Sequence, residues 1–239
     1  MLLVSGVIGA GKSSLTKELA KEMASIPFYE NVDDNEVLPL FYKNPQKYAF
    51  LMQIFFLNKR FLAMKNALKG SQNVLDRTIY EDAMILHLNA DLGRIKPAEE
   101  KQYNKIFNTM LQELEKLVPE NTPDLLIFID VSFETMLERI KKRGRDYEQI
   151  EKDASLYDYY RTLHQRYQQW YEAFSLCPKM KIDGDRYDFV EDKKALEVVL
   201  RQIKEKTTSL ETQRCQPHYQ PKSLVEKGIF LTEKSLSSL

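Results

Sequence analysis

The sequence predicts an α/β fold built on a parallel sheet. Two observations support this: short apolar runs alternate with segments of helical periodicity, and a glycine-rich stretch joins the first apolar run to the first helical segment. At 239 residues, one domain with a full core is the better expectation. The strand-like runs are Leu2–Ser5, Ile26–Tyr29, Asn73–Asp76, Leu125–Asp130 and Met180–Asp183.

Helical patterns fill the intervals between these runs. Leu15, Leu19 and Met23 recur four residues apart, which places them on one face of a helix over 12–23. A long helix is expected to begin at Pro45, a residue suited to a first helical position, and to run to Lys69. The other expected helices cover Ile79–Ala90, Pro97–Leu117, Phe133–Arg143, Leu156–Phe174 and Val190–Lys206.

The character of the chain changes at Thr207. From there to Leu239 the apolar residues are scattered, two prolines occur and the end is rich in serine. We therefore expect residues 1–206 to form the domain and residues 207–239 to be a poorly ordered extension, with one short packed piece around Gly228–Leu231.

The composition excludes several classes of protein. Lys plus Arg and Asp plus Glu both number 35, so no charge excess indicates a nucleic-acid or membrane partner. Cys177 and Cys215 lie far apart without metal-ligand spacing, which argues against a zinc site or a disulfide scaffold. No apolar segment approaches the roughly 18 residues of a membrane span, and the start lacks the features of a signal peptide. We expect a cytoplasmic protein.

The stretch Gly6–Ser13, "GVIGAGKS", matches the phosphate-loop pattern G-x-x-x-x-G-K-[ST] at every fixed position. It follows an expected strand and opens an expected helix, so backbone N–H groups would surround a phosphate. Lys12 would reach the β and γ phosphates, and the Ser13 hydroxyl would ligate Mg²⁺. A glycine-rich turn without nucleotide is the minor alternative. The residues expected to hold the nucleotide are Gly6, Gly9, Ala10, Gly11, Lys12, Ser13 and Ser14.

Two further segments narrow the class of reaction that the phosphate loop serves. The guanine-reading element N-K-x-D is missing, since "NKRF" at Asn58–Phe61 lacks the aspartate, and this argues against a GTPase switch. Arg139, Arg143 and Arg145 are spaced so that three guanidinium groups are expected to converge, as in a mobile lid that closes over ATP phosphates. The alternative is a solvated basic helix end that meets the helix dipole.

Polar residues are also expected around the molecule that accepts the phosphoryl group. Asp76 and Arg77 end a strand at the edge where the phosphate loop lies, so Asp76 could hold Mg²⁺ and Arg77 the reacting end of a substrate; a surface turn with Asp as helix cap is the alternative. Gln53 and Arg60, seven residues apart, share a helix face that suits a planar base. Aromatic residues surround them, although core packing explains most of these: Tyr48, Phe50, Phe55 and Phe56.

Taken in order, several stretches resemble the deoxyribonucleoside kinase family, most closely its bacterial deoxyguanosine and deoxyadenosine kinases. They are "GVIGAGKSS", "FYENVDDN", "LPLFYKNPQKYAFLMQIFFLNKRF", "LDRTIYEDA", "RIKKRGRDYEQ" and "KIDGDRYDF", and the similarity spans Met1 to Lys206. The resemblance implies a P-loop kinase with a five-stranded parallel sheet, an arginine-rich lid, ATP as donor, and a homodimer or a pair with a paralogous subunit.

The resemblance also implies a catalytic base, Glu30, facing the deoxyribose 5′-hydroxyl. On physical grounds an acid at the end of the second strand lies at the carboxyl edge of the sheet, near the incoming phosphate. The acids that follow, Asp33, Asp34 and Glu36, are better explained by turn and capping hydrogen bonds.

Further roles are carried over by resemblance. Tyr42 and Glu148 match the pair that holds the sugar 3′-hydroxyl, and Gln53 and Asp82 match the residues that read the base. The alternative for Asp82 is a helix-surface acid beside Glu81. The remaining matches are Arg60 and Arg77 as substrate-side arginines, Arg139, Arg143 and Arg145 as the lid, and Asp185 at the loop where the adenine of ATP rests.

The sequence thus predicts an ATP- and Mg²⁺-dependent kinase that phosphorylates the 5′-hydroxyl of a purine deoxynucleoside in salvage. A thymidylate-kinase-like nucleoside monophosphate kinase and a non-catalytic nucleotide-binding regulator are the alternatives. The choice between deoxyguanosine and deoxyadenosine, the dimer partner, the role of the tail and feedback inhibition by the corresponding triphosphate stay open.

Overall fold

A computed structural model describes residues 1–29, 35–70, 73–117 and 123–214. Its centre is a five-stranded sheet in the order β2-β3-β1-β4-β5, in which every neighbouring pair is parallel. The predicted five-stranded parallel sheet is therefore confirmed. The strands are β1 Leu2–Ser5, β2 Pro27–Phe28, β3 Val74–Asp76, β4 Leu125–Asp130 and β5 Lys179–Asp183.

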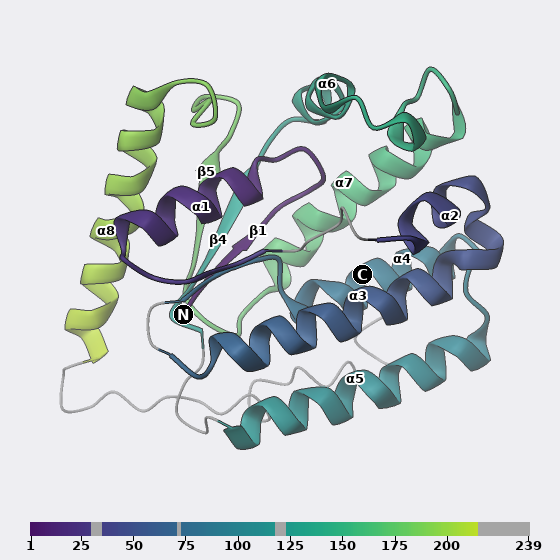
Figure 1. Cartoon of the computed structure of the whole chain (residues 1–239), viewed down its shortest axis with the longest axis horizontal. Helices are drawn as coiled ribbons and strands as arrows, with labels where there is room; N and C mark the ends of the chain where they lie inside the picture. The colour runs from purple at the N-terminus through teal and green to yellow at the C-terminus, as the bar shows by residue number, and fades with distance from the viewer. Residues whose placement is uncertain (30–34, 71–72, 118–122, 215–239) are drawn as a thin grey trace.

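Helices pack on both sides of this sheet, with α1 and α8 on one side and α3, α4 and α7 on the other, and α5 packs outside α3 and α4 (Figure 1). The helices are α1 Lys12–Glu22, α2 Val37–Lys43, α3 Pro45–Ala67, α4 Asp82–Asp91, α5 Pro97–Leu117, α6 Phe133–Arg143, α7 Ser155–Ala173 and α8 Lys193–Arg214, with short 3-10 turns η1 Ile79–Glu81 and η2 Asp146–Glu148. None of the helices within the described ranges is long and apolar enough to cross a membrane.

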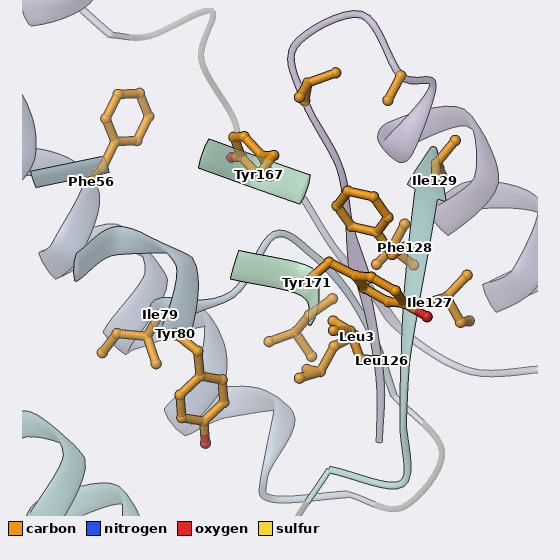
Figure 2. Close-up of a cluster of buried hydrophobic side chains, with 14 of the residues drawn as sticks. Leu3, Phe56, Ile79, Tyr80, Leu126, Ile127, Phe128, Ile129, Tyr167 and Tyr171 are labelled. Carbon is orange, nitrogen blue, oxygen red and sulfur yellow. The ribbon is translucent and has the colours of Figure 1, made fainter. Parts of the chain in front are cut away.

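The core is built on the two central strands. Both faces of β1 and β4 are covered by helices, which is why their residues are apolar without alternation up to the last residue of each strand and nearly all buried. Figure 2 shows the rings of Phe128 on β4 and Tyr171 on α7, which stack with centroids 4.7 Å apart. Removing one such fully buried side chain from water stabilises the fold by about 1.5–3 kcal/mol.

The parallel register brings the strand ends to one edge of the sheet. Val4 of β1 is level with Asp76 of β3 and with Ile127 of β4. The segments that follow β1, β3 and β4 therefore leave the sheet side by side, and ligands bind at this edge in open α/β folds.

Three features differ from the expected elements. The segment from Val37 to Lys43 forms α2, whose first turn is capped by Asn35: its side-chain oxygen accepts the N–H groups of Val37 and Leu38 at 2.9 and 3.0 Å. The helix expected over Ile79–Ala90 begins with the 3-10 turn η1. The last helix was expected over Val190–Lys206, but α8 runs from Lys193 to Arg214 and so continues through the start of the expected extension.

Candidate active site

The phosphate loop connects β1 to α1 in the conformation that its glycines permit. Gly6 has φ 146°, and a Cβ there would lie 2.7 Å from the carbonyl oxygen of Ile129 on β4. Gly11 has φ 95° and occupies the N-cap of α1, where it offers no side chain to satisfy the first helical N–H groups. These N–H groups can instead bind an anion.

Lys12 and Ser13 follow directly at the start of α1. The ammonium of Lys12 donates to the carbonyl oxygen of Val7 within the loop at 2.7 Å. The hydroxyl of Ser13 donates to the carboxylate of Asp76 at the end of β3. The two predicted Mg²⁺ ligands are thus adjacent, and a hydroxyl with a buried carboxylate is a suitable donor set for Mg²⁺, which prefers oxygen and takes further ligands from phosphates.

Two cavities meet at this loop. The smaller has a volume of about 290 Å³ and the larger about 740 Å³, and Lys12, Ser13 and Arg143 line both. The smaller cavity lies beside β3, α2, α3 and α7, and the larger lies between the phosphate loop, α6 and the segment after β5. A group bound in one cavity can therefore approach a group bound in the other at Lys12.

Buried polar residues line one end of the smaller cavity. Gln53 and Arg60 both project into it from α3, as their seven-residue spacing predicted, and their exposed fractions are only 1% and 6%. The amide nitrogen of Gln53 is buried without a hydrogen-bond partner in the described part of the chain. A bound molecule with an acceptor at this point would satisfy it.

Asp82 lies behind this wall. Its carboxylate, with no exposed surface, forms an ion pair with Arg60, which lines the cavity, whereas Asp82 itself does not. The alternative that Asp82 is a surface acid beside Glu81 is wrong, because both side chains are fully buried. Asp82 does not itself face the cavity, so any effect that it has on a bound molecule would pass through Arg60.

Tyr42 and Glu148 lie together elsewhere along the smaller cavity. Burial raises the pKa of Tyr42 well above its usual value, and the nearby Tyr160 and Glu148 raise it further, so Tyr42 is a neutral phenol at physiological pH. Glu148 is 1% exposed, and its carboxylate receives Arg143 at 2.5 Å and lies 3.7 Å from Arg145. A phenol beside a buried carboxylate can hold a hydroxyl group by donating and accepting hydrogen bonds.

The three arginines expected to form a lid do not converge on one volume. Arg143 and Arg145 share the carboxylate of Glu148, whereas Arg139 is held away from them by backbone carbonyls, donating to Ala10 at 3.3 Å and Gly184 at 2.8 Å. Arg139 lines only the larger cavity and Arg145 only the smaller one. The spacing of the arginines could not show this separation, because it depends on Glu148, the acid three residues beyond Arg145, which lies near Arg143 and Arg145 and divides them from Arg139.

Arg77 follows β3 and lines the smaller cavity. Its φ of 69° is in the left-handed region, which a residue with a side chain seldom adopts, and strain of this kind collects at functional sites. The guanidinium donates to the hydroxyl of Tyr167 and lies 3.6 Å from the carboxylate of Glu81. Asp76 and Arg77 thus face the phosphate loop as predicted and do not form a surface turn.

The flat walls of the smaller cavity come mostly from residues that the sequence analysis did not select. Of the four aromatic residues expected around Gln53, only Phe56 lines it. Three of the missed residues, Tyr159, Leu163 and Tyr167, recur four residues apart on α7, and this spacing could have indicated that they share one face of the helix. The missed residues include Leu38, Phe41, Met52, Ile85, Tyr159, Leu163 and Tyr167.

Asp185 lines the larger cavity after β5. Its carboxylate accepts the backbone N–H of Ser132 at 2.9 Å. Partial burial acts to raise the pKa of Asp185, but hydrogen bonds from Thr135 and Ser132 outweigh it and the pKa is lowered. Asp185 thus ties the segment after β5 to the start of α6, beside the phosphate loop.

Glu30, the expected catalytic base, lies outside the described residues, as do Asp33, Asp34 and Cys215. Among the residues that the structure describes, no group of three or more His, Cys, Asp or Glu side chains could hold a metal ion by itself. A Mg²⁺ ion at Ser13 and Asp76 would therefore need ligands from a bound nucleotide.

Comparisons with known proteins show the family of this chain. The model of the family "Deoxynucleoside kinase" matches residues 2–208. The chain is 53% identical over 203 residues to deoxyguanosine kinase of Lactobacillus johnsonii, covering 85% of this chain and 90% of that protein. It is 47% identical over 206 residues to deoxyadenosine kinase of Lactobacillus acidophilus, covering 86% and 95%.

Solved structures show the same fold. The structure of deoxyadenosine kinase from M. mycoides with bound dATP superposes with a TM-score of 0.70 at 28% identity, covering 85% of this chain and 98% of that one. The predicted resemblance is confirmed: this chain is an enzyme of the deoxynucleoside kinase family.

Proposed function

We propose that the protein transfers the γ-phosphoryl group of ATP to the 5′-hydroxyl of a purine deoxynucleoside, deoxyguanosine or deoxyadenosine. The observation that carries the proposal is the pair of cavities that share Lys12, Ser13 and Arg143. The larger is the site for ATP and the smaller is the site for the nucleoside. The names of the most similar relatives, deoxyguanosine kinase and deoxyadenosine kinase, support the purine acceptor.

The charges around the smaller cavity favour a neutral acceptor over a monophosphate. Each arginine that lines it lies near a buried carboxylate: Arg60 near Asp82, Arg77 near Glu81, and both Arg143 and Arg145 near Glu148. A nucleoside monophosphate would bring about two negative charges into a site whose four arginines already lie near carboxylates. A thymidylate-kinase-like activity is therefore disfavoured.

Catalysis would consist of positioning and of stabilising the charge on the transferring group. Lys12, Arg77 and the arginines of α6 and the following turn supply positive charge around the phosphoryl group, and Glu30 accepts the proton of the 5′-hydroxyl. Ser13 and Asp76 would hold Mg²⁺, which supplies charge neutralisation to the ATP phosphates when bound.

Base recognition would fall to the polar end of the smaller cavity. Gln53 offers a buried amide, and the Arg60–Asp82 pair offers hydrogen-bond donors whose orientation is set by the ion pair. Tyr42 and Glu148 would hold the 3′-hydroxyl of the sugar. On the donor side, Asp185 would shape the loop that contacts the adenine of ATP.

We propose a cytoplasmic protein on the basis of its composition. On the basis of the family resemblance, we propose that it acts as a homodimer or in a pair with a paralogous kinase subunit. The domain would extend beyond residue 206, because α8 continues to Arg214 and Leu210 packs against the core, with the rest of the chain as an extension.

The proposal is tested by incubating the protein with ATP, Mg²⁺ and a panel of deoxynucleosides and monophosphates, with ADP release and product mass as readouts. We expect deoxyguanosine and deoxyadenosine to be converted to monophosphates and thymidine to react poorly. Conversion of monophosphates to diphosphates would support the rival kinase activity, and no ADP release with any acceptor would support a non-catalytic role.

A further inference from the structure

Glu81 is a buried carboxylate that the proposed reaction does not use. It ends η1, four residues after Arg77, and has no exposed surface. Burying a carboxylate is costly unless donors or a cation surround it. The partners of Glu81 therefore indicate what it does.

These partners come from separate parts of the fold. Oε1 accepts the backbone N–H of Thr78 at 2.9 Å, and Oε2 accepts the hydroxyl of Ser5, the last residue of β1, at 3.1 Å. Oε2 also lies 3.6 Å from Nη1 of Arg77. Burial raises the pKa of Tyr167 on α7, and a hydrogen bond with Glu81 raises it further. Glu81 thus joins β1, the turn after β3, and α7.

Arg77 is the partner whose position affects the reaction. Its φ of 69° is unfavourable for a residue with a Cβ, and the surrounding contacts hold the conformation: the Arg77 N–H donates to the carbonyl oxygen of Val4 on β1 at 2.9 Å. The guanidinium donates to the hydroxyl of Tyr167, and its carbon lies 6.0 Å from the centre of that ring. Arg77 and Tyr167 both line the smaller cavity, whereas Glu81 lies behind them.

We propose that Glu81 is a positioning residue: its carboxylate, together with the hydroxyl of Tyr167, holds the guanidinium of Arg77 where the acceptor reacts. Ser5 and Thr78 fix the carboxylate in turn, so the position of Arg77 is set relative to the strand that leads into the phosphate loop. The inference rests on the proposed function, since it assigns Arg77 to the reacting end of the acceptor.

A purely structural role for Glu81 makes a different prediction. Thr78 and Glu81 form a capping box at η1, and an amide can replace the carboxylate there. In Glu81→Gln the side-chain oxygen can still accept the Thr78 N–H and the amide nitrogen can donate to Ser5. What the variant loses is the negative charge that faces Arg77.

The test is a double-mutant cycle of Glu81→Gln with Arg77→Ala, with kcat and both KM values as readouts. Glu81→Gln should lower kcat for the deoxynucleoside by about 10- to 100-fold, the usual effect of losing a supporting partner of a functional group, and change KM for ATP little. In the Arg77→Ala background, Glu81→Gln should lower kcat by less than about a further twofold, because the effect of Glu81 passes through Arg77. An unchanged kcat, or losses that multiply, would overturn the proposal.

Glu99→Gln is the matched control. Glu99 on α5 also accepts the backbone N–H of the residue three positions earlier, Lys96, at 2.8 Å, but it lines neither cavity. The kcat of the Glu99→Gln variant should equal that of the wild type. If Glu81→Gln does not fold, Tyr167→Phe takes its place in the cycle, and its loss in kcat should likewise disappear in Arg77→Ala.

The activity of the wild type tests the proposed function, and the activity of the variants tests the positioning role of Glu81. A wild type that phosphorylates no deoxynucleoside overturns the proposed function, and the positioning role with it. An active wild type whose Glu81→Gln variant, or Tyr167→Phe variant in its place, turns over at the normal rate overturns the positioning role alone.

Discussion

The two cavities at the phosphate loop differ in what lines them. The smaller is lined by buried polar side chains in ion pairs and by aromatic rings, with Gln53, Arg60 and Glu148 at most 6% exposed. The larger is lined by loop glycines and by exposed charged side chains such as Glu138, Lys142 and Glu191. Selectivity should therefore depend on side chains in the smaller cavity, and donor binding on the backbone of the phosphate loop.

Lys12 belongs to both cavities, so Lys12→Ala should have the largest effect. In the proposed mechanism Lys12 would contact charge both in bound ATP and in the transition state, so kcat should fall by about 10²- to 10³-fold and KM for ATP should rise. Steady-state kinetics with varied ATP measures both. Unchanged ATP affinity and turnover would contradict the assignment of the phosphate loop.

Glu30→Gln should affect only the chemical step. A positioned general base contributes roughly 10²-fold or more, so kcat should fall by that factor while nucleoside affinity, measured by calorimetry, stays near that of the wild type. A variant with near-normal turnover would remove Glu30 from the mechanism.

Asp82→Asn should change selectivity and stability together, because Asp82 orients Arg60 from a fully buried position. A wrong base that leaves a buried polar group unpaired costs roughly 1–3 kcal/mol, so discrimination between purine deoxynucleosides and thymidine should fall by about 5- to 150-fold. The free energy of unfolding should fall by a similar 1–3 kcal/mol. The measurements are relative kcat/KM for four deoxynucleosides and urea unfolding; an unchanged ranking would contradict base reading by this pair.

Asp185→Asn should have a small effect, since Asp185 is exposed at the larger cavity. Its pKa in the folded protein is lowered, so the carboxylate stabilises the fold above the unfolded value near 3.8, and this contribution is lost as the pH falls through the folded pKa. The Tm of the variant should be slightly below that of the wild type at pH 7, and the difference should narrow below about pH 4. A difference that widens on acidification would show that the sign is wrong.

Truncation should have the smallest effect. Leu210 on α8 packs against the core, so removing residues 207–239 takes away packed helix, whereas removing residues 215–239 leaves every described element intact. The shorter deletion should change kcat/KM and Tm little, and the longer one should lower Tm. Loss of activity in the shorter deletion would place residues of 215–239 within the functional unit.

The sequence was most informative where function depends on a local pattern. The phosphate loop and the strand ends are contiguous motifs, so residue order alone places Lys12, Ser13, Asp76 and Arg77 at one edge of a parallel sheet. The spacing of Gln53 and Arg60 likewise placed both on one face of a helix.

The misses concern contacts between distant segments. Asp82 pairs with Arg60 on another helix, and Glu148 separates Arg143 and Arg145 from Arg139; neither arrangement follows from spacing. Helix α2 was missed because Pro39 and an unbroken apolar run hide its period, although proline is tolerated in a first turn. The positive φ of Arg77 has no sequence signal, since arginine has no preference for that region.

The strand order has a consequence for synthesis of the protein. Within the described residues, β1 at residues 2–5 pairs with β3 and with β4, and β4 ends at Asp130. At the roughly 5–20 residues per second of translation, synthesis of β4 is completed about 6–25 s after that of β1. For the whole of that interval β1 lacks β4, one of its two neighbours in the sheet, so the apolar segment Leu2–Val4 stays open to binding by a chaperone.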